Sequence, residues 1–378
     1  MKANLITFTI LFISLFPAIS KGTHSSQSLP TADTDCTPAI TIDVVPEMGS
    51  FDNLEGTVSC ADPATHHVAV YIFTANGWWS KPTFANPLTL IQPDGSWNAN
   101  YTTGGTDHLA TMLIAFLVPD SYTPPLMGGG STLPAELFAN TLANDRVLRF
   151  SDFRWTVKQF DTPVGPGPNL FSGLPEDVWI DGNGRLHLTI SQHNGQWFST
   201  EVFTRETLGY GTYVFYTTGQ LDQLDENIIL GLFTWDNNAP ANYYREIDIE
   251  IAKWGNPANP NNAQFVVQPW DTPGNLHGFH IAPTTNQLTH AFSWDRERVT
   301  FTISTSHQYP PDPNDILATW AYAQPDNIPP TGPANARINL WLYWGSPPAN
   351  GEPEEVIIDG FQFLPHNSLF LPFVAYEN

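Results

Sequence analysis

The chain has 378 residues, 41% of them hydrophobic, with 37 acidic and 14 basic side chains and a formal net charge of −23. So acidic a chain, without a run of Lys or Arg, repels nucleic acid and anionic membranes, and we expect neither as a partner. Its length exceeds that of one ordinary domain and suits two, each with enough residues for a buried core.

The N-terminus has the pattern of a secretory signal peptide. Lys2 precedes an apolar stretch from Leu5 to Phe16, and small residues follow up to Ser20 at the spacing of a cleavage site. This stretch is shorter than the ~20 residues that a membrane-spanning helix needs, and no later segment is long and apolar enough. We therefore expect residues 1–20 to be a signal peptide and the protein to be secreted, whether extracellular or periplasmic, without a membrane span.

The next residues predict a leader and a disulfide. Residues 21–35 are rich in Ser, Thr and His without apolar periodicity, which is typical of a flexible segment. Cys36 and Cys60 are the only cysteines of the chain. An even pair in an exported protein is most simply a disulfide bond.

Residues 36–123 predict a small β-sandwich, which would be an accessory domain. Short β-rich segments alternate with turn signals such as Asn76-Gly77 and Asp94-Gly95. The candidates for a glycan-binding surface in this part are Trp78, Trp79, Trp97 and Phe84, and each of them suits the core as well. Adjacent residues on a strand face opposite ways, so at least one of Trp78 and Trp79 belongs to the core.

A cluster of Pro and Gly in residues 124–145 predicts a linker, and residues 146–365 predict a larger β domain. This second part has many short strand patterns and no convincing long helix, which favours two packed antiparallel sheets of the jelly-roll type. Residues 366–378 form a C-terminal tail, which is either a closing strand or an attachment signal. The predicted fold class is thus all-β, a jelly-roll sandwich preceded by a smaller sandwich.

The main functional signal is a run of alternating acids. Glu246, Asp248 and Glu250 are separated by Ile247 and Ile249, so on a β-strand the three carboxylates share one face while the isoleucines enter the core. Like charges packed this closely titrate as a coupled set. Glycoside hydrolysis uses one protonated and one ionised carboxyl group. A strand with one solvated face gives the same alternation, and these five residues alone do not separate the two interpretations.

The surrounding motifs resemble glycoside hydrolase family 16, in its E-x-D-x-E form typical of lichenases and xyloglucan transglycosylases. The resemblance covers about residues 146–365, and four segments occur in the family's order. They are Gly209-Tyr210-Gly211-Thr212-Tyr213, Gly231-Leu232-Phe233-Thr234-Trp235 before the acids, His290-Ala291-Phe292-Ser293-Trp294, and Ile338-Asn339-Leu340-Trp341.

This resemblance implies a jelly roll crossed by a glycan cleft, and cleavage with retention of anomeric configuration. Glu246 matches the family's nucleophile, Glu250 matches the general acid/base, and Asp248 matches the carboxyl group that tunes both. Residues four apart on a strand have Cα atoms ~13 Å apart, whereas the carboxyl groups of a retaining pair lie ~5–5.5 Å apart. The strand is therefore expected to be curved, with the side chains leaning together.

Substrate-binding residues are also implied. Asn339 and Trp341 match a segment that lines the family's cleft, Gln264 matches a glycan-contacting glutamine, and Glu201 lies in a Ser-x-Glu-like segment. Trp235 and Phe233 suit the cleft and the core equally. The chain departs from the family at Phe203, where an arginine is expected, which leaves subsite specificity open.

Asp359 matches an aspartate that helps to hold a structural calcium in relatives, although one oxygen ligand of the six to eight that calcium needs is a weak signal. No cofactor is expected for catalysis.

We therefore predict a secreted, monomeric, retaining glycoside hydrolase, endo-acting on a neutral or sulfated β-linked polysaccharide such as a β-glucan or a galactan. The alternatives are a transglycosylase on the same scaffold and a noncatalytic glycan-binding protein. The acid trio argues against the latter, because binding does not require three coupled carboxylates.

Overall fold

The computed structural model describes residues 36–75 and 77–366. The predicted signal peptide, the leader and all of the tail beyond His366 lie outside these residues. Within them, no helix is both long and apolar enough to cross a membrane. Cys36 and Cys60 are both disulfide-bonded, which confirms the predicted disulfide.

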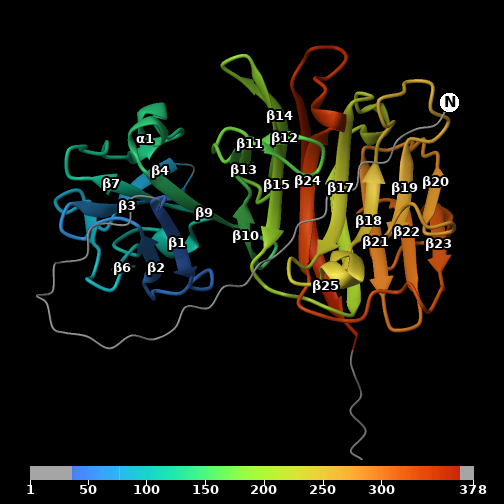
Figure 1. Ribbon diagram of the computed structural model, residues 1–378, viewed down its shortest axis with the longest axis horizontal. Coiled ribbons are helices and arrows are strands. Elements are labelled where there is room, and N and C mark those ends of the chain that lie inside the picture. The colour runs from blue at the N-terminus through green and yellow to red at the C-terminus, as the bar shows by residue number, and fades with distance from the viewer. Residues whose placement is uncertain (1–35, 76, 367–378) are drawn as a thin grey trace, which may run out of the picture. The chain divides into compact units, whose positions relative to one another are not determined.

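The larger part of the chain is a sandwich of two antiparallel sheets, as predicted (Figure 1). The first sheet carries the acid trio. Its strands, in spatial order, are β10 (Phe153–Val157), β15 (Gln196–Thr204), β24 (Asn335–Leu342), β17 (Ile228–Trp235), β18 (Ile247–Ile251), β19 (Ala263–Val267) and β20 (Leu276–Phe279).

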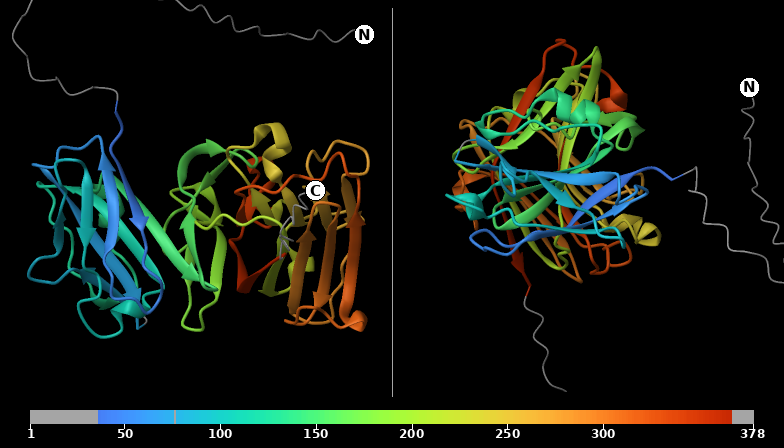
Figure 2. Two further views of the ribbon diagram at one scale, coloured as in Figure 1. Left: turned by 90° about the horizontal axis from the view of Figure 1, so that it is seen from below. Right: turned by 90° about the vertical axis from the view of Figure 1, so that its left-hand side faces the viewer.

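The second sheet covers the inner face of the first, and β21, β22 and β23 run side by side in Figure 2. Its strands, in spatial order, are β13 (Val178–Ile180), β14 (Leu186–His193), β25 (Glu354–Pro365), β16 (Gly211–Thr218), β21 (Gln287–Trp294), β22 (Val299–Thr305) and β23 (Ile316–Tyr322). Two short strands, β11 (Phe160–Val164) and β12 (Asn169–Phe171), pair with each other, and β12 also runs parallel to β15.

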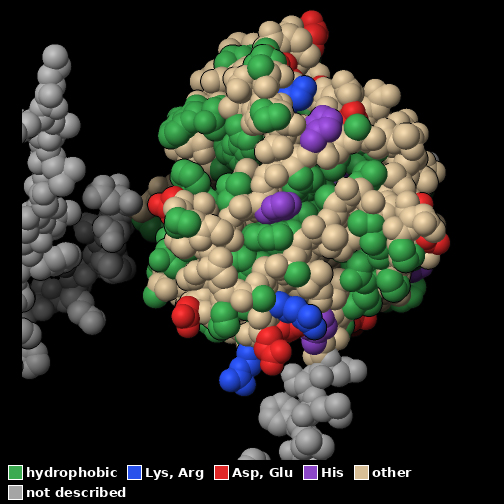
Figure 3. Space-filling view, turned by 90° about the vertical axis from the view of Figure 1, so that its right-hand side faces the viewer, with side chains coloured by type: hydrophobic (Ala, Val, Ile, Leu, Met, Phe, Trp, Pro, Cys, Tyr) green, Lys and Arg blue, Asp and Glu red, His purple; other side chains and the backbone are tan. Residues whose placement is uncertain are grey.

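Aromatic and branched aliphatic side chains fill the space between the sheets. The ring of Phe265 on β19 stacks on that of Phe301 on β22 with centroids 4.8 Å apart, and Trp155 on β10 meets Phe361 on β25 at 5.3 Å. Such aromatic pairs bury large apolar areas and dominate the packing of a core. Figure 3 shows the end of this sandwich at β20 and β23, where charged side chains are few.

The N-terminal strands form a second, smaller sandwich. One sheet holds β1 (Ala39–Val44), β2 (Leu54–Ser59) and β6 (Ser96–Ala99). The facing strands are β3 (His66–Thr74), β4 (Gly77–Lys81), β5 (Leu88–Leu90), β7 (Met112–Pro119) and β8 (Gly128–Gly130). A separate hydrophobic core, which includes Ile42, Leu54 and Leu113, lies between them.

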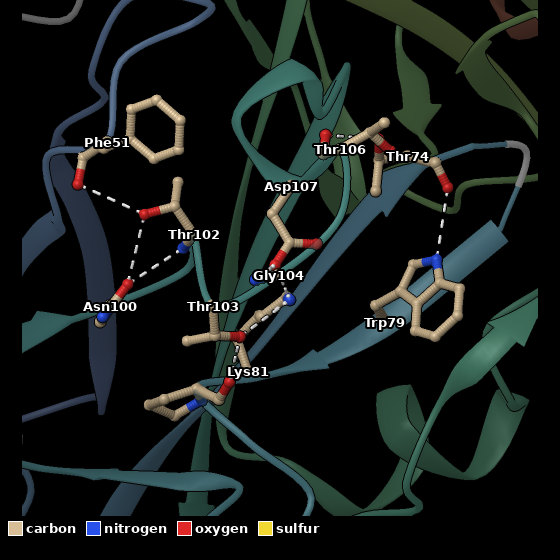
Figure 4. Close-up of polar contacts among 11 residues, drawn as sticks. Phe51, Thr74, Trp79, Lys81, Asn100, Thr102, Thr103, Gly104, Thr106 and Asp107 are labelled. Atoms are coloured by element: carbon tan, nitrogen blue, oxygen red, sulfur yellow. Dashed lines mark hydrogen bonds and ion pairs between the residues drawn. The ribbon is translucent and has the colours of Figure 1, made fainter.

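Polar contacts fix the loops of this smaller sandwich (Figure 4). Lys81 and Asp107 form a buried ion pair, and Lys81 also donates to Thr103 Oγ1 at 3.2 Å. Thr102 Oγ1 donates to the Phe51 carbonyl at 3.3 Å. A buried ion pair needs such additional hydrogen bonds to offset its desolvation.

The aromatic residues considered for glycan binding divide between the core and the surface. Trp78 and Trp97 are 1% exposed, so they are core residues and the idea that they form a sugar platform is wrong for both. Trp79 is half-buried, with its indole N–H donating to the Thr74 carbonyl, whereas Phe84 is exposed. The turn before β4 places the first tryptophan of the pair inside, because successive side chains alternate.

The segment predicted as a linker contains regular structure. It holds β8, helix α1 (Ala135–Asn140) and the start of β9 (Ala143–Phe150), and Leu137 of the helix is fully buried. Glycine does not prevent β8 from forming, because this strand pairs with β4 through backbone hydrogen bonds and needs no side-chain packing.

β9 belongs to both halves of the protein. Along one edge it pairs with β7, and along the other with β10, so one hydrogen-bonded sheet continues from the small sandwich into the large one. Val147 packs in the small core and Leu148 in the large one, as alternation on a shared strand requires. The described residues from Thr37 onward accordingly belong to one compact unit.

Leu148→Ala should therefore destabilise both halves together. Leu148 is fully buried, and removing its methyl groups leaves a cavity that costs about 2–5 kcal/mol of unfolding free energy. In urea, we expect circular dichroism and tryptophan fluorescence to report a single transition at a lower midpoint. Leu90→Ala, at a position that is 65% exposed, is the matched control and should leave the midpoint nearly unchanged. Two transitions, of which only one moves, would contradict a cooperative unit.

Candidate active site

The acid trio lies on the outer face of the first sheet. Ile247 and Ile249 are fully buried between the sheets, whereas Glu246, Asp248 and Glu250 line a pocket on the opposite face. Glu246 directly precedes β18 and has extended backbone angles, so the alternation includes it. The arrangement follows from the period of two in the sequence.

Cross-strand pairing sets the neighbours of each acid. One row across the sheet runs from Glu201 on β15 through Asn339, Gly231 and Glu250 to Gln264 on β19. Gly231 is required in this row, because a Cβ atom there would lie 2.4 Å from Asn339 Oδ1. The missing side chain leaves room between Asn339 and Glu250.

The next row carries the middle acid. It runs from Phe203 through Arg337 and Phe233 to Asp248, one step closer to Glu246. Directly opposed side chains on one face lie within contact distance of each other, so both rows form the floor of a single surface.

Two adjoining pockets form a cleft over this floor. The first, which we call the charged pocket, has a volume of about 490 Å³ and contains the whole trio; volumes of this size suit small-ligand sites. It is lined by Lys158, Gly165, Pro166, Glu201, Gly231, Phe233, Trp235, Glu246, Asp248, Glu250, Arg337, Asn339 and Trp341.

The second, the aromatic pocket, has a volume of about 520 Å³. It is lined by Pro166, Gly167, Glu250, Trp254, Gln264, Gln268, Trp270, Leu276, Trp341, Tyr343 and Trp344. The two pockets share Pro166, Glu250 and Trp341, so the cleft continues past Glu250 from a charged half into an aromatic half.

Burial raises the pKa of all three acids. Desolvation and the charge of Glu250 raise the pKa of Glu246 to about 8. A hydrogen-bond contact with Asp248 and the charge of Arg337 lower it by less. Desolvation raises the pKa of Glu250 to about 7, although the Gln264 amide donates to its carboxylate at 2.7 Å. Burial and the two flanking glutamates hold the pKa of Asp248 well above its usual range. The trio therefore retains protons at neutral pH.

The middle acid is in contact with Glu246. The contact between Asp248 and Glu246 raises the pKa of Asp248 and lowers that of Glu246, as expected when a protonated Asp248 donates to an ionised Glu246. Gln268 Nε2 also donates to Asp248, at 3.1 Å.

A charge network lies beside the trio. Glu201 is 1% exposed and accepts hydrogen bonds from Lys158 at 2.9 Å and from Arg337 at 2.8 Å. Asn339 Nδ2 approaches the same carboxylate at 3.5 Å. Two cationic partners compensate the burial of this carboxyl group, and their hydrogen bonds hold the neighbouring side chains in place.

Strained backbone occurs at both ends of the cleft. Near Glu246, residues Tyr243, Tyr244 and Arg245 have φ angles of 48°, 57° and 55°, and in the aromatic half Trp254 and Trp344 have φ angles of 56° and 52°. Left-handed angles are unfavourable for such side chains and occur where the surrounding structure requires them, often at functional sites.

The structure brings together all of the residues that the sequence suggested for catalysis and substrate binding. Glu201, Phe233, Trp235, Asn339 and Trp341 line the charged pocket with the trio, and Gln264 lines the aromatic one. Their roles remain predictions.

Several lining residues were not foreseen from the sequence. Arg337 lies two residues before Asn339 and Gln268 lies four residues after Gln264, so each shares the face of a predicted cleft residue. The alternation of side chains along a strand could therefore have predicted both. Lys158, Trp270 and Trp344 carry no such signal, because they lie outside the strand motifs.

Asp359 lies in β25 on the other sheet. One of its carboxylate oxygens is buried without a hydrogen-bond partner, and His307 Nε2 lies 3.6 Å from it. No group of three or more His, Cys, Asp or Glu side chains suited to a metal occurs among residues 36–75 and 77–366. Calcium at Asp359 stays a prediction that would depend on backbone oxygens.

No protein-family model and no curated protein matches the chain. Among solved structures, a native glycosidic hydrolase is 18% identical, covering 56% of this chain and 90% of that chain, with a TM-score of 0.42. A β-glucanase of Bacillus licheniformis is 16% identical, covering 56% of this chain and 92% of that chain, with a TM-score of 0.42. A glycoside hydrolase family 16 endo-glucanase of Bacteroides ovatus is 14% identical, covering 56% of this chain and 94% of that chain, with a TM-score of 0.41. At these identities and TM-scores, a function has to be argued from the site itself.

Glu246→Gln should stabilise the protein at alkaline pH. The pKa of Glu246 rises from 4.5 to about 8 on folding, so its contribution to stability is full below pH 4.5 and is lost as the pH rises to about 8. Glutamine does not ionise, and a shift from 4.5 to about 8 corresponds to a gain of up to about 5 kcal/mol of unfolding free energy for the variant at pH 8.5 relative to wild type, with no gain at pH 4.5. Glu297→Gln, at an exposed position, is the control. A gain that is equal at both pH values would exclude ionisation as its cause.

Proposed function

We propose that the protein is a retaining glycoside hydrolase that cleaves a β-linked polysaccharide internally, with Glu246 as nucleophile and Glu250 as general acid/base. The observation that carries this proposal is the buried trio, whose raised pKa values keep protons on carboxyl groups at neutral pH, at the junction of two halves of one cleft.

Two steps complete the reaction. In the first, protonated Glu250 donates to the glycosidic oxygen while the Glu246 carboxylate attacks the anomeric carbon, so the leaving sugar departs and a glycosyl-enzyme ester forms. In the second, the Glu250 carboxylate takes a proton from water, whose oxygen attacks the anomeric carbon and releases Glu246. Each step inverts the anomeric carbon, so the two steps together retain its configuration.

The active form of the trio carries two protons and one negative charge. The pKa of Glu246, about 8, lies above that of Glu250, about 7, but the charge of Glu250 is one cause of this rise and is absent once Glu250 is protonated. With Glu250 protonated, Glu246 is the member best suited to hold the charge, since its contact with Asp248 and the charge of Arg337 both lower its pKa. Among residues 36–75 and 77–366, Glu250 has only the amide of Gln264 as a hydrogen-bond partner, and it keeps its proton for the leaving group. Asp248 retains its proton and acts by orienting Glu246.

The cleft supports an endo-acting enzyme on a polysaccharide. The charged pocket contains the trio and the aromatic pocket extends the cleft past Glu250, so the cleft is longer than the trio itself, which suits cleavage within a chain. The aromatic half offers ring faces for the apolar C–H faces of sugars. Secretion is proposed from the predicted signal peptide, and the disulfide bond supports an oxidising compartment.

Transglycosylation is the second candidate. Trp270 and Trp344 line the aromatic pocket beside Glu250 and are 63% and 70% exposed. The side of the acid/base is where a leaving sugar departs and an acceptor enters, so a sugar stacked there would compete with water for the glycosyl-enzyme.

Wild type should release soluble oligosaccharides from at least one of lichenan, laminarin, xyloglucan, agarose and carrageenan, measured by mass spectrometry. Glu246→Gln should lower kcat/KM by about 10³-fold or more, because no glycosyl-enzyme forms. Glu297→Gln controls for a change of charge at an exposed position. Equal activity of Glu246→Gln and wild type would exclude Glu246 as the nucleophile.

Glu250→Gln should separate substrates by their leaving groups. On a polysaccharide, loss of the acid should lower kcat by about 10²–10⁴-fold, whereas an activated aryl glycoside needs little protonation and should retain much of its glycosylation rate. Burst kinetics with a dinitrophenyl glycoside would report this step. An equal loss on both substrates would contradict the assignment of Glu250.

Gln264→Leu should move the alkaline limb of the pH profile. The Gln264 amide stabilises the ionised form of Glu250, so removing it raises the pKa of that carboxyl group further. Activity that depends on protonated Glu250 should then persist to a pH higher by about half a unit or more in kcat/KM profiles. Gln362→Leu, on the other sheet, should not move the limb. A shift to lower pH would refute the acid role of Glu250.

A further inference from the structure

Arg337 occupies an unusual position on the floor of the charged pocket. It is 8% exposed, and its guanidinium lies over the rings of Phe203 at 4.7 Å and of Trp235 at 5.8 Å. Trp235 in turn stacks on Tyr244 with ring centroids 4.3 Å apart. Side chains from β15 and β17, with Tyr244 of the segment before β18 stacked behind Trp235, thus fix the guanidinium, which reduces the entropy it loses when it binds a ligand.

The hydrogen-bonding capacity of this side chain is only partly used. Nη1 donates to Glu201, whereas Nε is buried without a partner, and Nη2 has none among the described residues. Asn339 Oδ1, which lines the same pocket two residues along β24, is a buried acceptor that also lacks a partner. Unpaired buried donors and acceptors are costly, and a bound ligand that pairs with both recovers that cost.

A hydroxyl group satisfies both residues at once. Its oxygen accepts from a guanidinium N–H, while its hydrogen is donated to an amide oxygen. A sulfate ester or a methyl ether has no hydrogen to donate, so it would leave Asn339 Oδ1 unpaired. The contact of Asn339 Nδ2 with Glu201 orients the amide so that its oxygen is the free atom.

Charge supports the same conclusion. The two cations of the pocket, Lys158 and Arg337, both pair with Glu201, so the three side chains together carry one positive charge. The active trio carries one negative charge, which balances it. Since Glu246 must be ionised in the active form, the pocket has no net positive charge to offer a sulfate or a carboxylate. An anionic substituent would also be buried there at a high desolvation cost.

We propose that Arg337 is a specificity-determining residue which, with Asn339, binds a free hydroxyl group of the sugar beside Glu246, and that the enzyme accordingly selects polysaccharides that are neutral at this sugar. This rests on the proposed function. Glu201 acts as a positioning residue for both side chains. Arg337 also lies directly opposite Phe203, the position where the related family is expected to carry arginine, so a neighbouring strand supplies the guanidinium here.

Binding to a catalytically impaired protein tests the proposal separately from turnover. Glu250→Gln keeps the charge of Glu246, and its affinity should be measured by calorimetry for each neutral polysaccharide that wild type cleaves, or for lichenan, laminarin, xyloglucan and agarose if it cleaves none, and for chemically O-sulfated forms of the same polymers. We expect Glu250→Gln to bind the neutral form at least about 100-fold more tightly than the sulfated form. Adding Arg337→Met should weaken neutral binding by about 10-fold or more, and Arg337→Lys should restore part of it.

A double variant distinguishes recognition from mere neutralisation of Glu201. If Arg337 only compensates that charge, Arg337→Met should have no further effect once Glu201→Gln is present. If Arg337 binds sugar, Arg337→Met should still weaken affinity by several-fold in that background, because the oxygen of a glutamine at position 201 still accepts from Nη1 and positions the guanidinium. Arg298→Met, on an exposed arginine, is the control.

Tighter binding of the sulfated polymers, no effect of Arg337→Met, an effect that vanishes with Glu201→Gln, or no binding of any neutral polymer would each overturn the proposal. Neutral binding that depends on Arg337, without turnover by wild type, would support it while refuting the proposed hydrolase function.

Discussion

The burial of three carboxyl groups on one strand is the constraint on which the site depends. Ile247 and Ile249 anchor β18 in the core, and the alternation of the strand then forces Glu246, Asp248 and Glu250 together on the other face. Withdrawal from water and mutual repulsion raise their pKa values, which costs stability at neutral pH. The packed sandwich beneath must offset that cost, as is usual where a site is strained for function.

The neighbours of the trio are arranged to divide its protons unequally. The contact with Asp248 and the guanidinium of Arg337 lower the pKa of Glu246, and among the described residues Gln264 is the hydrogen-bond partner of Glu250. Gly231 contributes by having no side chain, since any Cβ atom would collide with Asn339. Environments that push the pKa values of like groups apart are how acid and nucleophile are assigned in carboxylate enzymes.

The small N-terminal sandwich is joined to this site through the backbone. β9 supplies hydrogen bonds to β7 on one side and to β10 on the other, so the sheet that carries the trio extends into the N-terminal part. Ion pairs reinforce the junction, with Arg205 bonded to Asp145 at 3.0 Å. Because a shared strand transmits destabilisation, we expect the two halves to unfold as one.

The sequence by itself determined the all-β class, the disulfide, and the shared face of Glu246, Asp248 and Glu250, because strand periodicity and cysteine pairing are local or compositional properties. Only the tertiary structure decided that Arg337 lies opposite Phe203 and beside Glu201, that Trp78 and Trp97 are core residues, and that the predicted linker joins a shared sheet. These depend on which strands become neighbours, and cross-strand register joins residues more than a hundred positions apart, which no local pattern specifies.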